Sequence, residues 1–328
     1  MSLRPLTSTT PWDNPLSDPL RVTAAWHGAN GGSNDEVLQL AGWLGKSVPL
    51  AVQVVAPATW ASSTPATGKK FKKLLRDQSE AFAATARTAL EEYVEEEMWA
   101  LEPARMMAST SESSSLTRAA DELDAHMILL GSRARKPKGT LLVSSLVDSL
   151  LESTTKPLLI VPQNLKLSKK GVTRVNYIFP GRNGLERNAG LWEATALARR
   201  IGVPIRLIAI SPDTLTGSDL DASLDTPNTS AQWYESALGK LDHARDAVID
   251  AAHALDPPAD DGLVVEVAVA VDHGWKKAVH SVKWKKGDLA CLAVRPTTQL
   301  KWVFGKAHPG KFLRHVPAPA LIFPYASA

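Results

Sequence analysis

The stretch HMILLGSRARKPKGTLLVSSLVDSLLESTTKPLLIVP, residues 126–162, decides the fold class of this chain. Its order predicts a strand, a basic loop, a short helix and a second strand. The apolar run that ends at Gly131 is typical of a strand buried on both faces. Ser145, with Asp148 three residues later, indicates the start of a helix. Pro157 can begin the second strand but could not lie inside it.

The same pattern returns near the C-terminus, and a second pair of matching stretches lies earlier in each half. Residues 126–162 match residues 288–324 without a gap, at a constant offset of 162. The stretches that end at Pro57 and Pro212 match at an offset of 155. Two matching pairs, in the same order and at nearly equal offsets, indicate tandem homologous domains rather than a solenoid, whose repeat would be about 20–50 residues long.

Strands and helices alternate in both halves, which predicts parallel sheets covered by helices and joined by right-handed crossovers. The predicted fold class is α/β, with two tandem Rossmann-like domains, each a five-stranded, mainly parallel sheet flanked by helices. We expect an N-terminal arm over residues 1–20, a first domain over 21–165, a lysine-rich linker over 166–173 and a second domain over 174–328.

The composition is that of an ordinary globular protein and narrows the functional classes. Of the 328 residues, 44% are hydrophobic and 22% are charged, and the net charge of +3 is too small to indicate nucleic-acid binding by itself. A single cysteine, Cys291, excludes an intrachain disulfide and fits a reducing compartment. No apolar run approaches the roughly 20 residues that span a bilayer, and the N-terminus lacks a signal-peptide core. We therefore expect a cytoplasmic protein without a membrane partner.

Each half resembles a universal stress protein domain, and the whole chain resembles a tandem universal stress protein with the adenine-nucleotide α-hydrolase-like fold. That family has the pattern Gly-x2-Gly-x9-Gly-Ser/Thr between a buried strand and a short helix. In the first half the pattern falls on Gly131, Ala134, Ser144 and Ser145, so the spacing is kept while two of the three glycines are replaced.

The second half departs from the family pattern at every position. Ala293, Pro296, Lys306 and Ala307 stand where the family has glycines and a hydroxyl residue. If an adenine nucleotide such as ATP binds this chain, the resemblance therefore implies that it binds the first half.

The resemblance also points to residues near the end of the first strand. His27 stands where the family has an aspartate that contacts adenosine, and the neighbouring Trp26 either stacks on a base or fills the core. Arg133 is one of four cations in the loop that could neutralise phosphate charge. The candidate binding residues are Trp26, His27, Gly131, Arg133, Ala134, Ser144 and Ser145.

No motif in the sequence indicates catalysis or a metal site. The histidines lack zinc-binding spacing, and no Gly-x-Ser-x-Gly elbow is present. Lysines alternate with Trp275 and Trp284, but such patches are usually solvated helix faces, so nucleic acid is not an expected partner.

Three functions stay open at this point. The first is a non-enzymatic stress-response protein in which a nucleotide acts as a regulatory ligand. The second is a nucleotide-free scaffold for an unknown protein partner. The third, a weak nucleotide-hydrolysing enzyme, is disfavoured because no acid is evidently placed for Mg²⁺ or for base catalysis. We also expect the two domains to pair through their last strands, over residues 157–161 and 319–323, and a further homodimer is left open.

Overall fold

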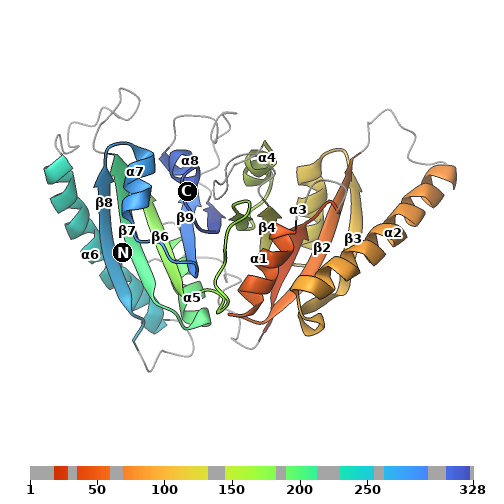
Figure 1. The fold of residues 1–328 in the computed structure, drawn as a ribbon, viewed down its shortest axis with the longest axis horizontal. Helices are drawn as coiled ribbons and strands as arrows, with labels where there is room; N and C mark the ends of the chain where they lie inside the picture. The colour runs from red at the N-terminus through yellow and green to blue at the C-terminus, as the bar shows by residue number, and fades with distance from the viewer. Residues whose placement is uncertain are drawn as a thin grey trace.

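The computed structural model describes residues 18–28, 35–59, 69–131, 145–181, 190–212, 230–254, 262–294 and 308–325. Figure 1 shows two similar halves side by side, each a sheet with helices on both faces. The elements of the first half are β1 (Leu20–Ala25), α1 (Glu36–Gly45), β2 (Leu50–Thr59), α2 (Lys69–Tyr93), the short 3₁₀ helix η2 (Glu96–Met98), β3 (Trp99–Ser109), α3 (Glu112–Glu122), β4 (Met127–Gly131), α4 (Ser145–Ser153) and β5 (Leu158–Val161).

The second half repeats this order. Its elements are β6 (Arg174–Pro180), α5 (Leu191–Ile201), β7 (Ile205–Pro212), α6 (Ser230–Ala254), β8 (Val265–Asp272), α7 (Trp275–Ser281), β9 (Asp288–Val294), α8 (His308–Leu313) and β10 (Ala320–Pro324). The predicted α/β class and the two tandem five-stranded units are thus confirmed.

The two halves share one ten-stranded sheet, in the order β3-β2-β1-β4-β5-β10-β9-β6-β7-β8. Neighbouring strands run parallel within each half, while β5 and β10 pair antiparallel, with Ile160 opposite Ala320 and Leu158 opposite Ile322. The expected pairing of the two last strands is confirmed. It covers the apolar edge that each five-stranded unit would otherwise expose.

The strand register reproduces the sequence repeat. Leu20 lies opposite Leu50 in the first half, and Val175 lies opposite Ile205 in the second, so both partners shift by 155 positions. Equivalent backbone hydrogen bonds form just after β1 in the first half and just after β6 in the second half. The amide of Trp26 donates to the carbonyl of Val55 at 3.0 Å, and that of Gly181 donates to Ile210 at 2.7 Å.

A hydrophobic core lies on each face of the sheet, because strands buried on both faces carry apolar side chains at successive positions. One face, under α1, α2, α5 and α6, includes Leu40 and Leu207. The opposite face, under α3, α4, α7 and α8, includes Ile128 and Phe312. In the parts of the chain that the structure describes, no helix is long and apolar enough to cross a membrane.

The expected linker, residues 166–173, is hydrogen-bonded to both halves. The amide of Ser168 donates to the carbonyl of Lys286 at 3.0 Å, and that of Val172 donates to the hydroxyl of Ser47 at 2.7 Å. Residues 1–17 of the expected N-terminal arm lie outside the described residues, and β1 begins at Leu20. The exact domain boundaries stay a prediction.

Candidate functional site

The strand order of the first half reverses between β1 and β4, since the chain builds outward to β2 and β3 on one side and to β5 on the other. In open parallel sheets, ligands bind at the carboxyl ends of the strands that flank such a switch point. Trp26 and His27 directly follow β1, and Gly131 ends β4. The fold therefore brings Trp26 and His27 close to Gly131, although Gly131 follows them by about a hundred positions in the sequence.

Trp26 is part of the hydrophobic core. Its side chain is 1% exposed, and its ring centroid lies 5.8 Å from that of Phe82 on α2. Its indole N–H points to the carboxylate of Asp35, 3.3 Å away at the start of α1. Of the two roles considered for Trp26, burial supports core packing over stacking on a ligand base.

His27 forms a pair that the sequence did not indicate. Its Nε2 lies 2.8 Å from Oε1 of Glu112, the first residue of α3, and both side chains are about one quarter exposed. Glu112 is held there because Ser111 caps α3, its hydroxyl accepting a hydrogen bond from the amide of Ser114 at 3.1 Å. A carboxylate therefore stands beside the strand end, although it comes from α3 rather than from β1.

The packing of the described residues does not require glycine at position 131. A Cβ at this position would meet, among the described residues, only the Cβ of Val37, at 4.0 Å, which is an ordinary contact. Gly42 differs, because a Cβ there would overlap the backbone of Tyr93. The space beside Gly131 permits close approach of a ligand to the backbone.

The N-terminus of α4 supplies the last described part of this region. Ser145 is exposed in the first turn, and three residues later Asp148 is half-buried, with an Oδ1 that has no hydrogen-bond partner in the described part of the chain. Burial, with a smaller effect of the Glu152 charge, raises the pKa of Asp148 from 3.8 to about 6. The other candidates, Arg133, Ala134 and Ser144, lie outside the described residues.

The raised pKa of Asp148 predicts how stability depends on pH. The folded state holds the proton more tightly than the unfolded state, so this group stabilises the fold at low pH and the stabilisation is lost as pH rises through about 6. We expect Asp148→Asn to be more stable than the wild type at about pH 8, with the difference shrinking to nothing near pH 4. Denaturant unfolding at both pH values measures this, with the exposed Asp250→Asn on α6 as the control. A pH-independent difference would contradict the burial argument.

The equivalent position in the second half is filled by the chain's own side chains. Gly181 follows β6 as Trp26 follows β1, and a Cβ at Gly181 would overlap the ring of His308 at the start of α8. The His308 ring also packs against Trp275 of α7, with 5.5 Å between ring centroids. Beyond the switch point, a Cβ on Gly190 would lie 3.1 Å from Ala293, which occupies the position of Gly131.

Metal ligands do not gather at the described part of this edge. No group of three or more His, Cys, Asp or Glu side chains among the described residues has the geometry of a metal site.

Comparison with known proteins identifies relatives over much of the chain. Residues 32–162 match the universal stress protein family. Universal stress proteins of Mycobacterium tuberculosis and Mycobacterium bovis are each 26% identical over 222 residues, which cover 66% of this chain and 70% of theirs. The crystal structure of a universal stress protein from Archaeoglobus fulgidus aligns with 93% of this chain and 96% of its own, with a TM-score of 0.54. At 12% identity, that similarity concerns the fold alone.

Proposed function

We propose that this chain, whose residues 32–162 match the universal stress protein family, is a non-enzymatic, cytoplasmic stress-response protein whose first half binds ATP or a related adenine nucleotide as a regulatory ligand. In this proposal the nucleotide lies at the switch point between β1 and β4. Its phosphates face the N-terminus of α4, where backbone amides and the Ser145 hydroxyl can donate hydrogen bonds.

The observation that carries the proposal is Gly131. Described packing does not demand glycine there, since the nearest neighbour of an added methyl would be Val37 at 4.0 Å. A role in ligand approach explains a glycine that the fold itself can do without. The contrast with Ala293 in the second half, which packs tightly against Gly190, supports placing the ligand in the first half.

His27 and Glu112 support recognition of the nucleoside. The resemblance places an aspartate at the position of His27, and the carboxylate of Glu112 lies 2.8 Å from the histidine ring. Carboxylate oxygens accept hydrogen bonds from ribose hydroxyls, while an imidazole can donate or accept. We propose that the pair together takes the role of the single family aspartate.

Regulatory binding is preferred to hydrolysis because the described carboxylates near the switch point are already engaged or shielded. Glu112 is paired with His27, and Asp148 is half-buried on α4. Neither is presented as a base for an attacking water. Mg²⁺-dependent ATP turnover by the purified chain, lost in Glu112→Gln, would favour the enzyme alternative instead.

A titration with ATP tests the binding proposal. We expect Gly131→Val to weaken binding at least tenfold, about 1.4 kcal/mol, because the new side chain would occupy the space into which the ligand approaches. Ser145→Ala should cost about 1.5 kcal/mol, the lower end of the range for one hydrogen bond to a charged group. Isothermal titration calorimetry measures both effects.

The control for this titration is Gly239→Val on α6, where an added Cβ meets no described atom within 4 Å. It should bind as the wild type does. Full affinity in Gly131→Val would contradict the assigned position. No binding by the wild type at millimolar ATP would reject the nucleotide proposal and support the scaffold alternative.

A further inference from the structure

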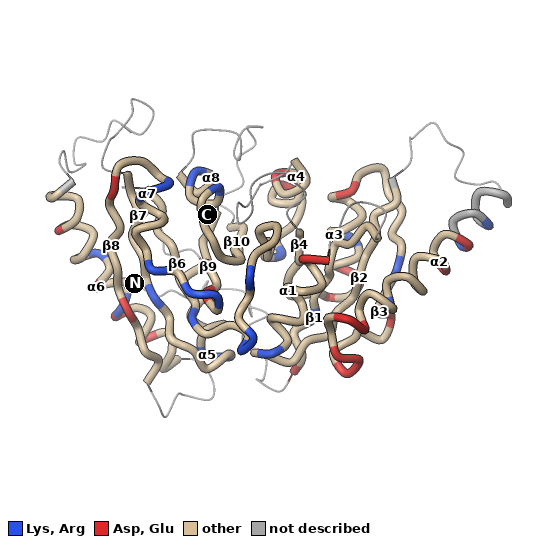
Figure 2. The backbone as a smooth tube through the Cα atoms, in the orientation of Figure 1, with Lys and Arg blue, Asp and Glu red and all other residues tan. Residues whose placement is uncertain are grey.

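Seven exposed lysines gather at the edge of the sheet where the strands begin, near the junction of the two halves. We name them the lysine surface: Lys46, Lys166, Lys169, Lys170, Lys283, Lys285 and Lys286. No ion pair in the described part of the chain includes any of them. Figure 2 shows these basic segments at the lower centre of the molecule. A surface with this much unpaired charge of one sign attracts an anionic partner.

Three segments far apart in sequence build the lysine surface. The linker and the segment before β9 are joined by the bonds from Ser168 to Lys286 at 3.0 Å and from Thr173 to Gly287 at 2.8 Å. The linker and the end of α1 are joined by the bond from Val172 to the Ser47 hydroxyl. These bonds hold the lysines in a fixed arrangement, so the surface is a feature of the folded protein.

A matching acidic surface lies along the same edge, farther out in the first half. Six exposed glutamates around the end of α2, η2 and β3 form the glutamate surface: Glu91, Glu92, Glu95, Glu96, Glu97 and Glu102. Figure 2 shows them as the acidic turns at the lower right. Glu102 has a nearby cation, Arg105, but at 3.9 Å this contact is weak.

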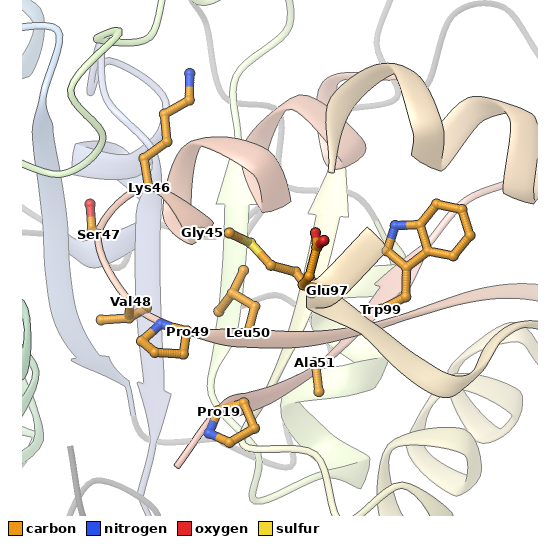
Figure 3. A pocket seen from close by; sticks show the side chains of 11 residues that line it. Pro19, Gly45, Lys46, Ser47, Val48, Pro49, Leu50, Ala51, Glu97 and Trp99 are labelled. Atoms are coloured by element: carbon orange, nitrogen blue, oxygen red, sulfur yellow. The ribbon is translucent and has the colours of Figure 1, made fainter. Parts of the chain in front are cut away.

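An open apolar groove of about 660 Å³ connects the two surfaces. Lys46 from the lysine surface and Glu97 from the glutamate surface both line it, and Figure 3 shows Lys46 on the left, Glu97 nearer the middle and Trp99 beyond it. Its floor and walls include Pro49, Leu50 and Trp99. The groove lies where β1 and β2 begin, at the opposite edge of the sheet from the switch point, so it is independent of the candidate nucleotide site.

We propose that this edge binds a second copy of the chain, forming a symmetric homodimer. A twofold axis through the middle of the groove exchanges its two ends. That operation places the lysine surface of each protomer on the glutamate surface of its partner and lays one apolar groove over the other. An interface of this kind must be self-complementary, and the order of lysine surface, groove and glutamate surface satisfies that condition.

A second copy fits this edge better than a nucleic acid does. A polyanion could contact the lysine surface, but it would be repelled by the six glutamates beyond the groove and would leave the apolar walls unused. A second protomer engages all three parts at once. The test below separates the two partners, because nucleic-acid binding requires the lysines only.

The test uses charge reversal on each surface. One variant carries Lys169→Glu, Lys170→Glu and Lys286→Glu, and the other carries Glu95→Lys, Glu96→Lys and Glu97→Lys. All six side chains are exposed, so the folded state should tolerate the changes. By analytical ultracentrifugation at low salt we expect a dimeric wild type, and each variant alone should be monomeric because like charges now face each other.

Mixing the two variants is the decisive experiment. The variant with the three lysine changes is acidic at both surfaces, and the variant with the three glutamate changes is basic at both. A mixture of the two should therefore form a heterodimer with the mass of the wild-type dimer. This dimer and the wild-type dimer should dissociate in about 1 M salt, where the Debye length is about 3 Å. The matched control, Lys276→Glu with Lys277→Glu on α7, changes exposed lysines away from this edge and should stay dimeric.

Several outcomes would reject the proposal. A monomeric wild type at low salt would do so, as would single variants that dimerise normally or a mixture that stays monomeric. Masses that grow beyond the dimer with concentration would indicate head-to-tail contacts instead of a twofold pair. Binding of duplex DNA that the lysine reversal removes and the glutamate reversal preserves, without dimerisation, would assign the lysine surface to nucleic acid.

Discussion

We expect Asp288→Ala to lower the free energy of unfolding by about 3–5 kcal/mol, the usual cost of removing one partner of a buried ion pair. Asp288 begins β9 and its side chain is fully buried. Its two carboxylate oxygens accept hydrogen bonds from Nε and Nη2 of Arg174, both at 3.0 Å. Oδ2 also accepts from the amide of Lys285 at 2.8 Å. Without the carboxylate, the buried guanidinium of Arg174 would keep only the half-exposed Glu266, 3.3 Å away, to compensate its charge.

A second buried arginine depends on the same carboxylate. Arg206 on β7 is 7% exposed, and its Nη2 lies 3.8 Å from Oδ2 of Asp288. Its Nε donates to Asn176 at 2.8 Å. Burial lowers the pKa of Arg206, and the charge of Arg174 lowers it further. Burial also opposes the charge on Arg174, but hydrogen bonding and attraction to Asp288 outweigh it and raise the pKa of Arg174.

Denaturant unfolding of Asp288→Ala and the wild type measures the effect. Glu266→Gln is the matched control, since Glu266 also contacts Arg174, at 3.3 Å, but its side chain is 47% exposed. Removing that solvated charge should cost less than about 1 kcal/mol. Equal costs for the two variants, or an Asp288→Ala protein within 1 kcal/mol of the wild type, would show that water compensates both arginines.

This ion network illustrates what the sequence does not reveal. Apolar runs and internal repeats predicted the strands and the tandem organisation, because buried strands have a local signature. The pairing of β5 with β10 was expected from the resemblance to universal stress proteins and from the need to cover an apolar edge. Arg174, Arg206 and Asp288 come together only when β6, β7 and β9 are neighbours in the sheet. No local pattern distinguishes them from surface charges, so their burial became visible only with the fold.

Edge strand β3 shows another limit. The sequence predicts a strand over residues 104–108, whereas β3 spans Trp99–Ser109. Glu102 and Pro103 interrupt its apolar pattern, and the register with β2 shifts between Val52 and Val54. Charges, proline and an irregular register are tolerated at an edge because one side of the strand carries no ladder, and they discourage pairing with other chains.

The sequence predicted part of the arrangement of the candidate residues, while their role in binding stays a prediction. Trp26, His27 and Gly131 do meet at the switch point, since the carboxyl ends of neighbouring parallel strands share one edge. Glu112 was missed. It lies 85 positions after His27 in the sequence. Its place directly after the cap residue Ser111 indicates that a helix begins there, but it does not indicate which residues the start of that helix contacts.

In the second half, Gly181 and the ring of His308 are in close contact at the switch point, and only glycine at position 181 allows this contact. Gly181 has a φ of +84°, a left-handed conformation that costs other residues roughly 1–2 kcal/mol. Its Cα also faces the ring of His308, so an added methyl would overlap that ring. Overpacking of this kind typically costs about 1–3 kcal/mol. We expect Gly181→Ala to lower the free energy of unfolding by about 2–5 kcal/mol in total.

Two further variants separate the conformational cost from the overlap. Gly202 ends α5 with a φ of +73°, and a Cβ there meets no described atom within 4 Å, so Gly202→Ala should show the backbone cost alone. The double variant Gly181→Ala with His308→Ala lacks the overlapping ring. The difference in unfolding free energy between this double variant and His308→Ala alone should therefore be no larger than the cost of Gly202→Ala. Equal costs for Gly181→Ala and Gly202→Ala in the wild-type background would mean that the His308 ring moves aside freely. The second-half switch point would then be open to a ligand, and its closure would no longer support placing the nucleotide in the first half alone.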